Sequence, residues 1–371
     1  MKVAIATKWI DEAYTGVGLY TRQLVEALLE MAPSEDLELT LVHKAASQDP
    51  VYHRAHEVRY KALPGPFWVM SQEKALRRLA GEVDLVHEPY IGVRSRLPVP
   101  SVVMVHDTMP LDFPQYSPAS FRAYFRRVMP KVLERASAVL VNSNRTKEDV
   151  LRHFSVPREK VHAVYLGSDH MAAPGPEAQE VRKALGLAGV RYFLAVGTSG
   201  TKNLPLTIAA FQHFRQEVDK GVRLVVAGKL PPEAVRAAAI AGAQPGAIVE
   251  LGHVGRDKLP ALYAGALAVV CPSLYEGFGF VPLEAMRVGT PAVVSDRGSL
   301  PEVCGNGALT VPIEDPARLS RAMARVLEPA MREKLIAAGR ARAATFTWRN
   351  TAVGTLMVYR RALERPRESP G

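Results

Sequence analysis

Short apolar runs recur along the chain, and stretches with helical spacing separate most of them. Unbroken apolar runs suit parallel strands that are buried on both faces. The runs at 2–7, 37–42, 83–87, 101–105, 139–141 and 161–166 predict strands in the first half. Those at 192–196, 223–227, 266–271 and 290–294 predict strands in the second half. The pattern therefore predicts an α/β protein with parallel sheets.

The alternation of strands and helices stops at residues 168–180, where Gly175 lies between two prolines. A chain of 371 residues is also too long for one ordinary core. We therefore expect two facing Rossmann-like domains, 1–170 and 171–346, with a last helix over 347–365. Residues 46–70 carry no periodic pattern and are expected to be irregular.

The stretch after the run at 266–271 combines a glycine-rich loop with two carboxylates. Gly277 and Gly279 allow a ligand to approach the backbone, and Pro282 suits the first position of a helix over 283–288. A helix start after such a loop favours anions. Glu276 and Glu284 flank it, so the ligand should carry hydroxyl groups as well as negative charge. Alternatively, Glu284 only complements the dipole of its helix and Glu276 is a solvated loop residue.

The sequence of this stretch resembles a known signature. Glu276-Gly-Phe-Gly-Phe-Val-Pro-Leu-Glu284, then Gly289-Thr-Pro and Ser295-Asp-Arg-Gly-Ser-Leu-Pro-Glu302, is similar to the donor site of family-4 retaining glycosyltransferases of the GT-B fold. Weaker likeness extends over nearly the whole chain. The resemblance implies that 1–170 is the acceptor-side domain and 171–346 the domain that binds a nucleotide sugar. It also implies that helix 347–365 crosses back to the first domain.

The resemblance assigns roles to residues of the second half. It implies that Glu284 holds the ribose and that Glu276 lies beside the donor sugar. The backbone at Gly277, Phe278 and Gly279 would meet the sugar and diphosphate. In the loop 197–203, Lys202 matches the lysine that neutralises the leaving diphosphate. Many relatives carry an arginine where Thr198 stands, so Lys229 at the end of the next strand is a candidate second cation.

In the first half, His106 and Asp107 directly follow a predicted strand, where open α/β sheets place ligands. A histidine at such a position is otherwise structural, and nothing nearby supplies two further metal ligands. The resemblance implies that His106 contacts the donor sugar and that Gly16, Gly18 and Asp107 lie on the acceptor side. Without the resemblance, the two glycines indicate only a tight turn.

The net charge and its distribution indicate which classes of partner the protein could bind. Lys plus Arg minus Asp plus Glu is 47 − 37, a net charge of +10, but no nucleic-acid-binding module accompanies it. The helix expected over 117–135 carries five cations on one side beside aromatic residues that are expected to be exposed. It predicts reversible attachment to an anionic membrane or to a lipid-linked acceptor. Alternatively, the charged stripe is only a solvated helix face. The cations are Arg122, Arg126, Arg127, Lys131 and Arg135.

Cysteines, apolar length and acidic pairs indicate the setting of the protein. Two cysteines cannot form a disulfide framework, and no apolar run is long enough to span a bilayer. A cytoplasmic protein is expected, with peripheral contact at the inner face of the membrane. Zinc-type clusters and the Asp-x-Asp pair are absent from the sequence, so metal-independent catalysis without a cofactor is expected.

Together these features predict that a sugar is transferred, with retention of configuration, from a nucleoside diphosphate sugar to a hydroxyl acceptor. GDP-mannose is the first candidate for the donor. The context resembles bacterial mannosyltransferases of surface-polysaccharide or glycolipid assembly, and the resemblance implies Glu276, His106 and Lys202 as catalytic residues. A nucleotide-sugar epimerase of the same fold remains an alternative. So does a catalytically inactive nucleotide-binding protein, which turnover of a donor would exclude.

Overall fold

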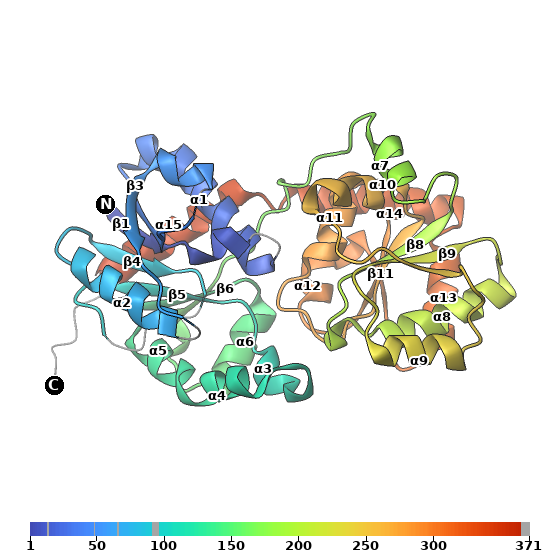
Figure 1. Cartoon of the computed structure of the whole chain (residues 1–371), viewed down its shortest axis with the longest axis horizontal. Helices are drawn as coiled ribbons and strands as arrows, with labels where there is room; N and C mark the ends of the chain where they lie inside the picture. Colours follow the sequence, from blue (N-terminus) through green and yellow to red (C-terminus); the bar gives the residue numbers. More distant parts are fainter. Residues whose placement is uncertain (13–14, 48, 65–66, 91–95, 365–371) are drawn as a thin grey trace. The chain divides into compact units, whose positions relative to one another are not determined.

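The chain divides into two compact units. Unit 1 comprises Met1–Gly167 together with Thr347–Gly371, and unit 2 comprises Ser168–Phe346. The computed structural model describes residues 1–12, 15–47, 49–64, 67–90 and 96–364 (Figure 1). The division expected after residue 170 lies close to the observed one, whereas the acceptor and donor roles of the two halves stay predictions.

Unit 1 is built on a parallel sheet of seven strands in the order β3-β2-β1-β4-β5-β6-β7. The edge strand β3 corrects the expectation that 46–70 is irregular, since it pairs in parallel with β2. Its sequence, HEVRY, is too polar to be recognised as a buried strand. The strands are β1 (Lys2–Ala6), β2 (Glu38–Lys44), β3 (His56–Tyr60), β4 (Leu85–Glu88), β5 (Ser101–Val105), β6 (Ala138–Val141) and β7 (Val161–Ala163).

Helices cover both faces of this sheet. In-register neighbours of parallel strands point to the same face, so Ala4 and Val86 share a face. That face packs against α2, and its continuation on β5 and β6 packs against α4, α5 and α6. Helices α1 and α15 pack together on the sheet. The helices are α1 (Gly16–Glu35), α2 (Trp68–Leu79), α3 (Met109–Asp112), α4 (Ala119–Arg127), α5 (Met129–Arg135), α6 (Asn144–His153) and α15 (Trp348–Glu364).

The single helix expected over 117–135 is two helices, α4 and α5, which meet at Val128. Pro130 is the second residue of α5, where its missing N–H costs least. The aromatic residues expected to be exposed instead pack in the core: Phe125 is buried, and Phe121 and Tyr124 are partly buried against it. The three aromatic residues between Ser117 and Arg135 are therefore buried or half-buried and do not stand exposed beside the cations.

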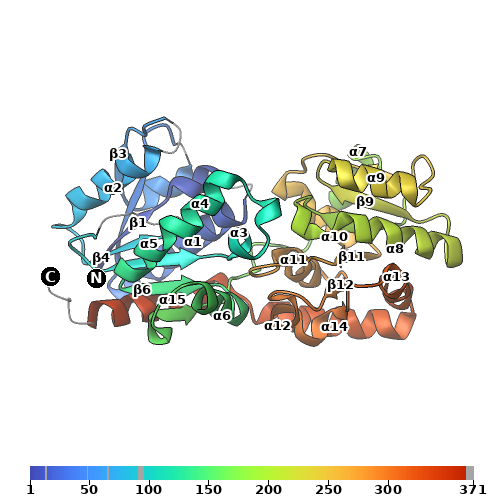
Figure 2. The same cartoon turned by 90° about the horizontal axis from the view of Figure 1, so that it is seen from below.

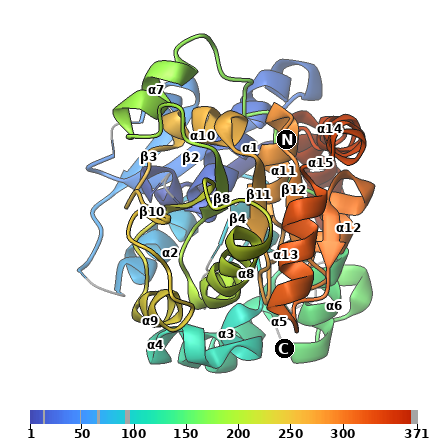
Figure 3. The same cartoon turned by 90° about the vertical axis from the view of Figure 1, so that its right-hand side faces the viewer.

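Unit 2 is built on a second parallel sheet of six strands in the order β10-β9-β8-β11-β12-β13. One face packs against α8, α9 and α13, and the other against α10 and α11 (Figure 3). The strands are β8 (Tyr192–Val196), β9 (Arg223–Ala227), β10 (Ile248–Glu250), β11 (Ala268–Cys271), β12 (Ala292–Ser295) and β13 (Leu309–Val311). The helices are α7 (Ala178–Ala184), α8 (Leu204–Glu217), α9 (Pro232–Ile240), α10 (Leu259–Gly265), α11 (Phe280–Val288), α12 (Leu300–Cys304), α13 (Pro316–Arg325) and α14 (Pro329–Ala344).

The last helix, α15, returns to unit 1, as the sequence predicted. Its buried Tyr359 hydroxyl lies within hydrogen-bond distance of His87 Nδ1 at the end of β4. At the point of return, Gly167 lies against the backbone of Trp348. A Cβ added to Gly167 would approach Trp348 N to 2.3 Å, so only glycine fits there.

Gly167→Ala should therefore lower stability by about 1–3 kcal/mol or more, because the new methyl group overpacks against backbone that cannot move aside. Gly81→Ala is the matched control, since nothing lies within 4 Å of a Cβ added there. It should change stability by less than about 1 kcal/mol. Thermal unfolding midpoints of the two variants check the difference, and equal midpoints would contradict the close packing of Gly167 on Trp348.

Candidate active site

The carboxyl ends of the parallel strands of unit 2 meet at one edge of the sheet. Neighbouring strands β9, β8, β11 and β12 each end there in a loop. These loops carry Lys229, Lys202, Glu276 and Ser299, in that order across the sheet. Ligands of open α/β sheets bind at this edge, so the candidate site begins here.

Glu276 is held by a cation and a hydroxyl group. Lys202 Nζ donates to its Oε1 over 2.6 Å, and Ser273 Oγ donates to the same oxygen over 2.7 Å. The side chain of Glu276 is 16% exposed and that of Lys202 is 20% exposed. Hydrogen bonds between charged groups are short and about twice as strong as neutral ones. The pair therefore fixes the carboxylate while leaving it open to a ligand.

The backbone at Glu276 depends on the glycine that follows β12. Gly298 has φ 59°, and a Cβ added to it would lie 2.6 Å from Glu276 O. Glycine alone allows both this conformation and this approach. Next to it, Ser299 Oγ donates to Glu276 O and to Phe278 O over 3.0 and 2.7 Å. Two loops of the edge are thereby tied together.

Lys202 lies in the turn η6 (Gly200–Lys202) that follows β8. Its stem packs over Gly197, where an added Cβ would come within 3.2 Å of Lys202 Cε and where φ is 83°. Burial is the largest single influence and lowers the pKa of Lys202. The charge and hydrogen bond of Glu276, together with the influence of Cys271 and Glu284, outweigh it, so the net pKa lies above the ordinary value. The ammonium group is therefore charged at neutral pH.

Glu284 on α11 is almost completely buried, with 2% of the residue exposed. Tyr263 Oη donates to its Oε2 over 2.8 Å, and His170 Nε2 lies 3.1 Å from its Oε1. Arg256 Nη1 lies 3.5 Å from Oε1. Because a carboxylate offers about four acceptor directions, these three partners leave about one direction, on Oε2, for a ligand.

Helix α11 begins earlier than the sequence indicated. It starts at Phe280, so Pro282 is its third residue rather than its first. Gly279 caps it with φ 103°, a conformation that glycine adopts at no steric cost. The Phe278 side chain is 4% exposed and packs on Phe280 and Phe346. Phe278 therefore offers a ligand its backbone and not its ring.

The candidate second cation is placed differently from the first. Lys229 is exposed and follows Gly228, which closes an isolated bridge with Gly252. The Thr198 methyl group lies over Gly228, 2.5 Å from where a Cβ would stand. Strands β8 and β9 are in register up to Val196 and Ala227, so Lys229 and Lys202 share the edge.

His106 follows β5 in unit 1 and is 9% exposed. Its Nε2 lies 2.8 Å from Pro89 O, which can only accept, so this nitrogen carries the proton. Burial lowers the pKa of His106 to about 4, and the bond to Pro89 offsets part of that effect. The ring is therefore neutral at pH 7 and lies edge-on to Tyr20 at 4.9 Å. It suits hydrogen bonding with a hydroxyl group rather than binding of an anion.

The three predicted acceptor residues also belong to unit 1. Gly16 and Gly18 are the first and third residues of α1, so they open a helix instead of forming a separate turn. Thr15 caps that helix by accepting from Gly18 N over 3.0 Å. Asp107 Oδ1 accepts from Met109 N at the start of α3. These contacts give structural roles, and acceptor binding at these residues stays a prediction.

Sequence reasoning missed the residues that hold the two glutamates. His170 lies in the segment read as a linker, and Tyr263 and Arg256 come from α10 and the turn before it. Nothing in their spacing indicates that they meet Glu284. Ser299 lies in the motif Ser295–Glu302 and Ser273 lies three positions before Glu276, but neither was given a role. Nearness in sequence could have indicated Ser273, whereas Ser299 is 23 positions away from Glu276.

Within the part of the chain that the structure describes, no group of three or more His, Cys, Asp or Glu residues is placed to hold a metal ion. None of the described helices is long and apolar enough to cross a membrane. Both cysteines, Cys271 and Cys304, are free and buried.

The chain is similar to known glycosyltransferases in both sequence and structure. Residues 177–342 match the family described as glycosyl transferases group 1, and residues 14–171 match glycosyltransferase family 4. O-antigen chain mannosyltransferase B of Escherichia coli is 29% identical over 97% of this chain and 100% of its own. The solved structure of sucrose-phosphate synthase from Thermosynechococcus elongatus superposes with a TM-score of 0.72 at 22% sequence identity, over 97% of this chain and 98% of its own. That of Anabaena HepE in complex with UDP and glucose also superposes with a TM-score of 0.72, at 17% identity, over 96% of this chain and 99% of its own. The shared fold is GT-B.

The ion pair at the edge generates a pH prediction. In Glu276→Gln the charge that raises the pKa of Lys202 is gone while burial remains, so this pKa should fall below its ordinary value. A raised folded-state pKa contributes stability below the unfolded pKa of about 10.4, and that contribution is lost as the pH rises through the folded value. Glu276→Gln should therefore lack this contribution to stability. NMR titration of ¹³C-methylated lysines measures the change in the pKa of Lys202.

Glu314→Gln is the control for this titration, because Glu314 pairs with Arg297 on the surface. It should leave the pKa of Lys202 unchanged. A Lys202 pKa that is the same in wild type and Glu276→Gln would show that the carboxylate does not set it.

Proposed function

Because the chain belongs to the group-1, family-4 glycosyltransferases, we propose that it transfers a sugar from a nucleoside diphosphate sugar to a hydroxyl acceptor with retention of configuration. GDP-mannose is the proposed donor. The observation that carries the proposal is the Lys202–Glu276 pair at the carboxyl edge of the sheet in unit 2, beside the start of α11. A cation and helix-terminal N–H groups suit a diphosphate, and a carboxylate suits sugar hydroxyls.

The proposed chemistry is electrostatic. The bond between the anomeric carbon and the diphosphate oxygen breaks, and Lys202 with the first N–H groups of α11 stabilises the negative charge on the leaving diphosphate. The acceptor oxygen forms the new bond and its proton passes to the departing phosphate. Glu276 orients the sugar and favours positive charge at the anomeric carbon. Lys202 donates only one of its three N–H groups to Glu276, so it retains capacity for the diphosphate.

Glu284 is the proposed ribose ligand. The donors from Tyr263, His170 and Arg256 hold its carboxylate in one place. A fixed acceptor with one remaining direction suits a hydroxyl that does not change during the reaction. His106 is the proposed sugar contact from unit 1, through its neutral imidazole. Lys229, exposed at the same edge as Lys202, is the proposed second cation.

The identity of the sugar and acceptor rests on likeness. The E. coli relative that matches over its full length is named for mannose and for an O-antigen chain. We propose a mannosyl donor and a glycan or lipid-linked acceptor for this chain, in surface-polysaccharide or glycolipid assembly. The predicted membrane contact at α4 and α5 keeps an electrostatic basis through Arg126, Arg127 and Lys131, which are exposed. Arg122 instead donates to Pro114 O and Ser117 O and belongs to the local structure.

A panel of GDP-, UDP- and ADP-sugars tests the proposal. A donor that binds the folded protein raises its unfolding midpoint by mass action, and GDP-mannose should give the largest rise.

Turnover is the second test. Enzyme that has been dialysed against EDTA should transfer mannose from labelled GDP-mannose to an acceptor, with the α configuration retained. An isomerised free donor would indicate an epimerase, and binding without turnover would indicate a nucleotide-binding protein. Activity lost in EDTA and restored by Mg²⁺ or Mn²⁺ would contradict metal independence.

The two glutamates should separate binding from chemistry. Ribose contacts are equal in ground and transition states, so Glu284→Ala should raise the donor KM and leave kcat nearly unchanged. At about 1.5–3 kcal/mol for a charged hydrogen bond, the rise is about 10- to 150-fold. Glu276→Gln keeps the size of the side chain but removes its charge, so it should lower kcat by about 10²-fold with little change in donor binding.

Folding must be verified before the kinetics are compared. Glu284→Ala leaves the buried Tyr263 hydroxyl without its partner, a cost of about 1–3 kcal/mol. The double variant Glu284→Ala, Tyr263→Phe removes both groups and provides the matched control, because its KM should match that of Glu284→Ala. The reverse pattern, with a raised KM for Glu276→Gln and a lowered kcat for Glu284→Ala, would contradict the assignment.

A further inference from the structure

Large apolar side chains gather on the surface of unit 1 around the start of α2. Leu63, Phe67 and Met70 are 48%, 59% and 61% exposed. They lie within eight positions of one another in a segment that sequence analysis left without a role. Scattered apolar side chains on a surface need no explanation, whereas several together mark a contact site.

The outer stripe of α2 is apolar at one end and cationic at the other. Phe67, Met70, Lys74 and Arg78 follow each other at spacings of three, four and four residues, which places them on one side of a helix. The opposite side packs in the core through its buried residues Gln72, Ala75, Leu76 and Leu79. Helix α2 is thus fully docked on its sheet, and its outer stripe is the part that faces solvent.

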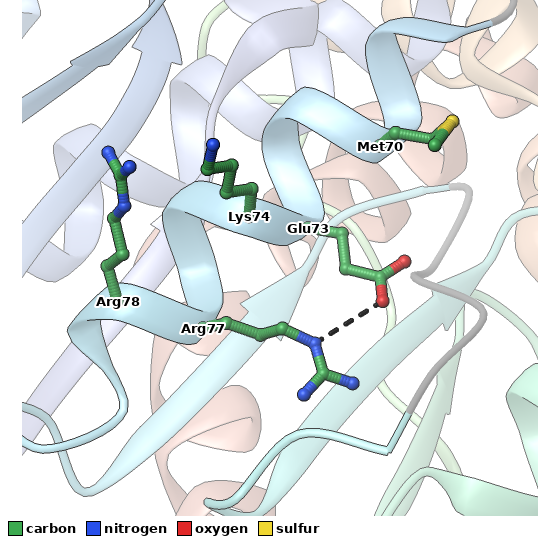
Figure 4. A pocket seen from close by; sticks show the side chains of 5 residues that line it. All are labelled: Met70, Glu73, Lys74, Arg77 and Arg78. Carbon is green, nitrogen blue, oxygen red and sulfur yellow. Dashed lines mark hydrogen bonds and ion pairs between the residues drawn. The ribbon is translucent and has the colours of Figure 1, made fainter.

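The charges on this stripe leave a net positive balance. Met70, Glu73, Lys74, Arg77 and Arg78 line a surface groove of about 370 Å³ (Figure 4). Arg77 Nε pairs with Glu73 Oε1 at 3.4 Å, and Arg77 also donates to Arg96 O. Lys74 and Arg78 extend together on the side of the helix away from that pair (Figure 4). They are the two charges that Glu73 does not balance.

We propose that the outer stripe of α2, with Leu63 and Phe67 at its start, docks unit 1 on the surface of an anionic lipid bilayer. Phe67 and Met70 enter the boundary between headgroups and acyl chains, and Lys74 and Arg78 lie among the lipid phosphates. A helix with apolar residues beside cations suits this interfacial position. The inference rests on the proposed membrane contact and names a surface for it other than α4 and α5.

Charge selects the bilayer over the other candidates for this surface. A second copy of the chain would bring Lys74 and Arg78 against the same cations. A neutral apolar partner would leave both cations without a counter-charge. A bilayer that contains anionic lipid supplies phosphates next to an apolar layer, which matches the order of groups along the stripe. Long basic side chains reach headgroups while their stems stay on apolar surface.

The exposed cations of α4 and α5 support the same orientation. Helices α2, α4 and α5 pack on the same face of the sheet of unit 1 (Figure 2). The solvent-exposed sides of the three helices therefore belong to the same side of unit 1. Arg126, Arg127 and Lys131 are exposed on α4 and α5, so they add long-range attraction to a plane that α2 contacts directly.

Vesicle binding of the full-length protein tests the proposal. The vesicles contain phosphatidylcholine with phosphatidylglycerol, and pure phosphatidylcholine is the comparison. Lys74→Gln with Arg78→Gln should weaken partitioning by about 30-fold at low salt, which corresponds to about 1 kcal/mol for each cation. In about 1 M salt, where the Debye length is about 3 Å, that difference should nearly vanish. Phe67→Ser with Met70→Ser should weaken partitioning by about 10-fold or more at both salt concentrations.

Trp68 provides a local readout because it directly follows Phe67. Lipids with brominated acyl chains should quench its fluorescence in the wild type, and most of the quenching should be absent in Trp68→Phe. Trp348 is 4% exposed and should contribute little. The ring of Trp9 lies 6.0 Å from that of Trp68, so both proteins are compared in a Trp9→Phe background. Quenching that persists unchanged in Trp68→Phe would place the membrane contact elsewhere and overturn the proposal.

A matched control comes from α9 in unit 2, which exposes Val235 and Ile240 by 54% and 88%. Val235→Ser with Ile240→Ser should leave vesicle binding unchanged, because the charges of Arg236 and Glu233 on that helix cancel. The proposal would be overturned if the α9 and α2 variants lost vesicle binding equally. It would also be overturned if the wild type bound vesicles equally well with and without phosphatidylglycerol. Donor thermal shifts are measured on the same proteins. Their absence in the wild type would count against the proposed function and not against this surface.

Discussion

The candidate site depends on one constraint: the Glu276 carboxylate is largely shielded from water and must be paired. Lys202 supplies the pair from the neighbouring strand end. The lysine stem requires Gly197 beneath it, and the Glu276 backbone requires Gly298 beside it. Glycines that are far apart in sequence are thus explained by one charge interaction. A partly buried charge that loses its partner is costly, so the pair links the integrity of the loops to the chemistry they serve.

The two glutamates of the motif differ in how strongly the protein holds them. Three donors from three different segments reach Glu284, and almost none of it is exposed. Glu276 has one ammonium and one hydroxyl group on a single oxygen and keeps some exposure. Groups held in place where charge develops favour the transition state, and Lys202 and Ser273 hold Glu276 in this way. Contacts that are equal in the ground and transition states contribute to binding alone. The division into ribose binding at Glu284 and sugar chemistry at Glu276, which the resemblance implied, stays a prediction that the kinetics of the two variants decide.

The sequence predicted what depends on local patterns. Apolar runs located the buried strands, and the glycine loop with its helix located the edge where the site lies. It failed where a residue's environment is set from a distance. Strand β3 is too polar to show a buried face, and α2 carries its apolar residues on both its core side and its surface. His170 meets Glu284 although 114 positions separate them, because the residues after β7 pass beside α11. The aromatic residues of α4 follow a helical period whether they face core or solvent, so the period alone did not decide their burial.

The excess positive charge becomes informative only when it is located. Summed over the chain, +10 fits many partners. Some cations of unit 1 are used internally, such as Arg122 on the carbonyls before α4 and Arg77 on Glu73. Those that remain on α2 adjoin exposed apolar side chains, while the exposed apolar residues of α9 adjoin one cation and one acid. Paired charge thus lies at the strand ends of unit 2, and α2 in unit 1 carries two cations that the single acid of that helix does not balance.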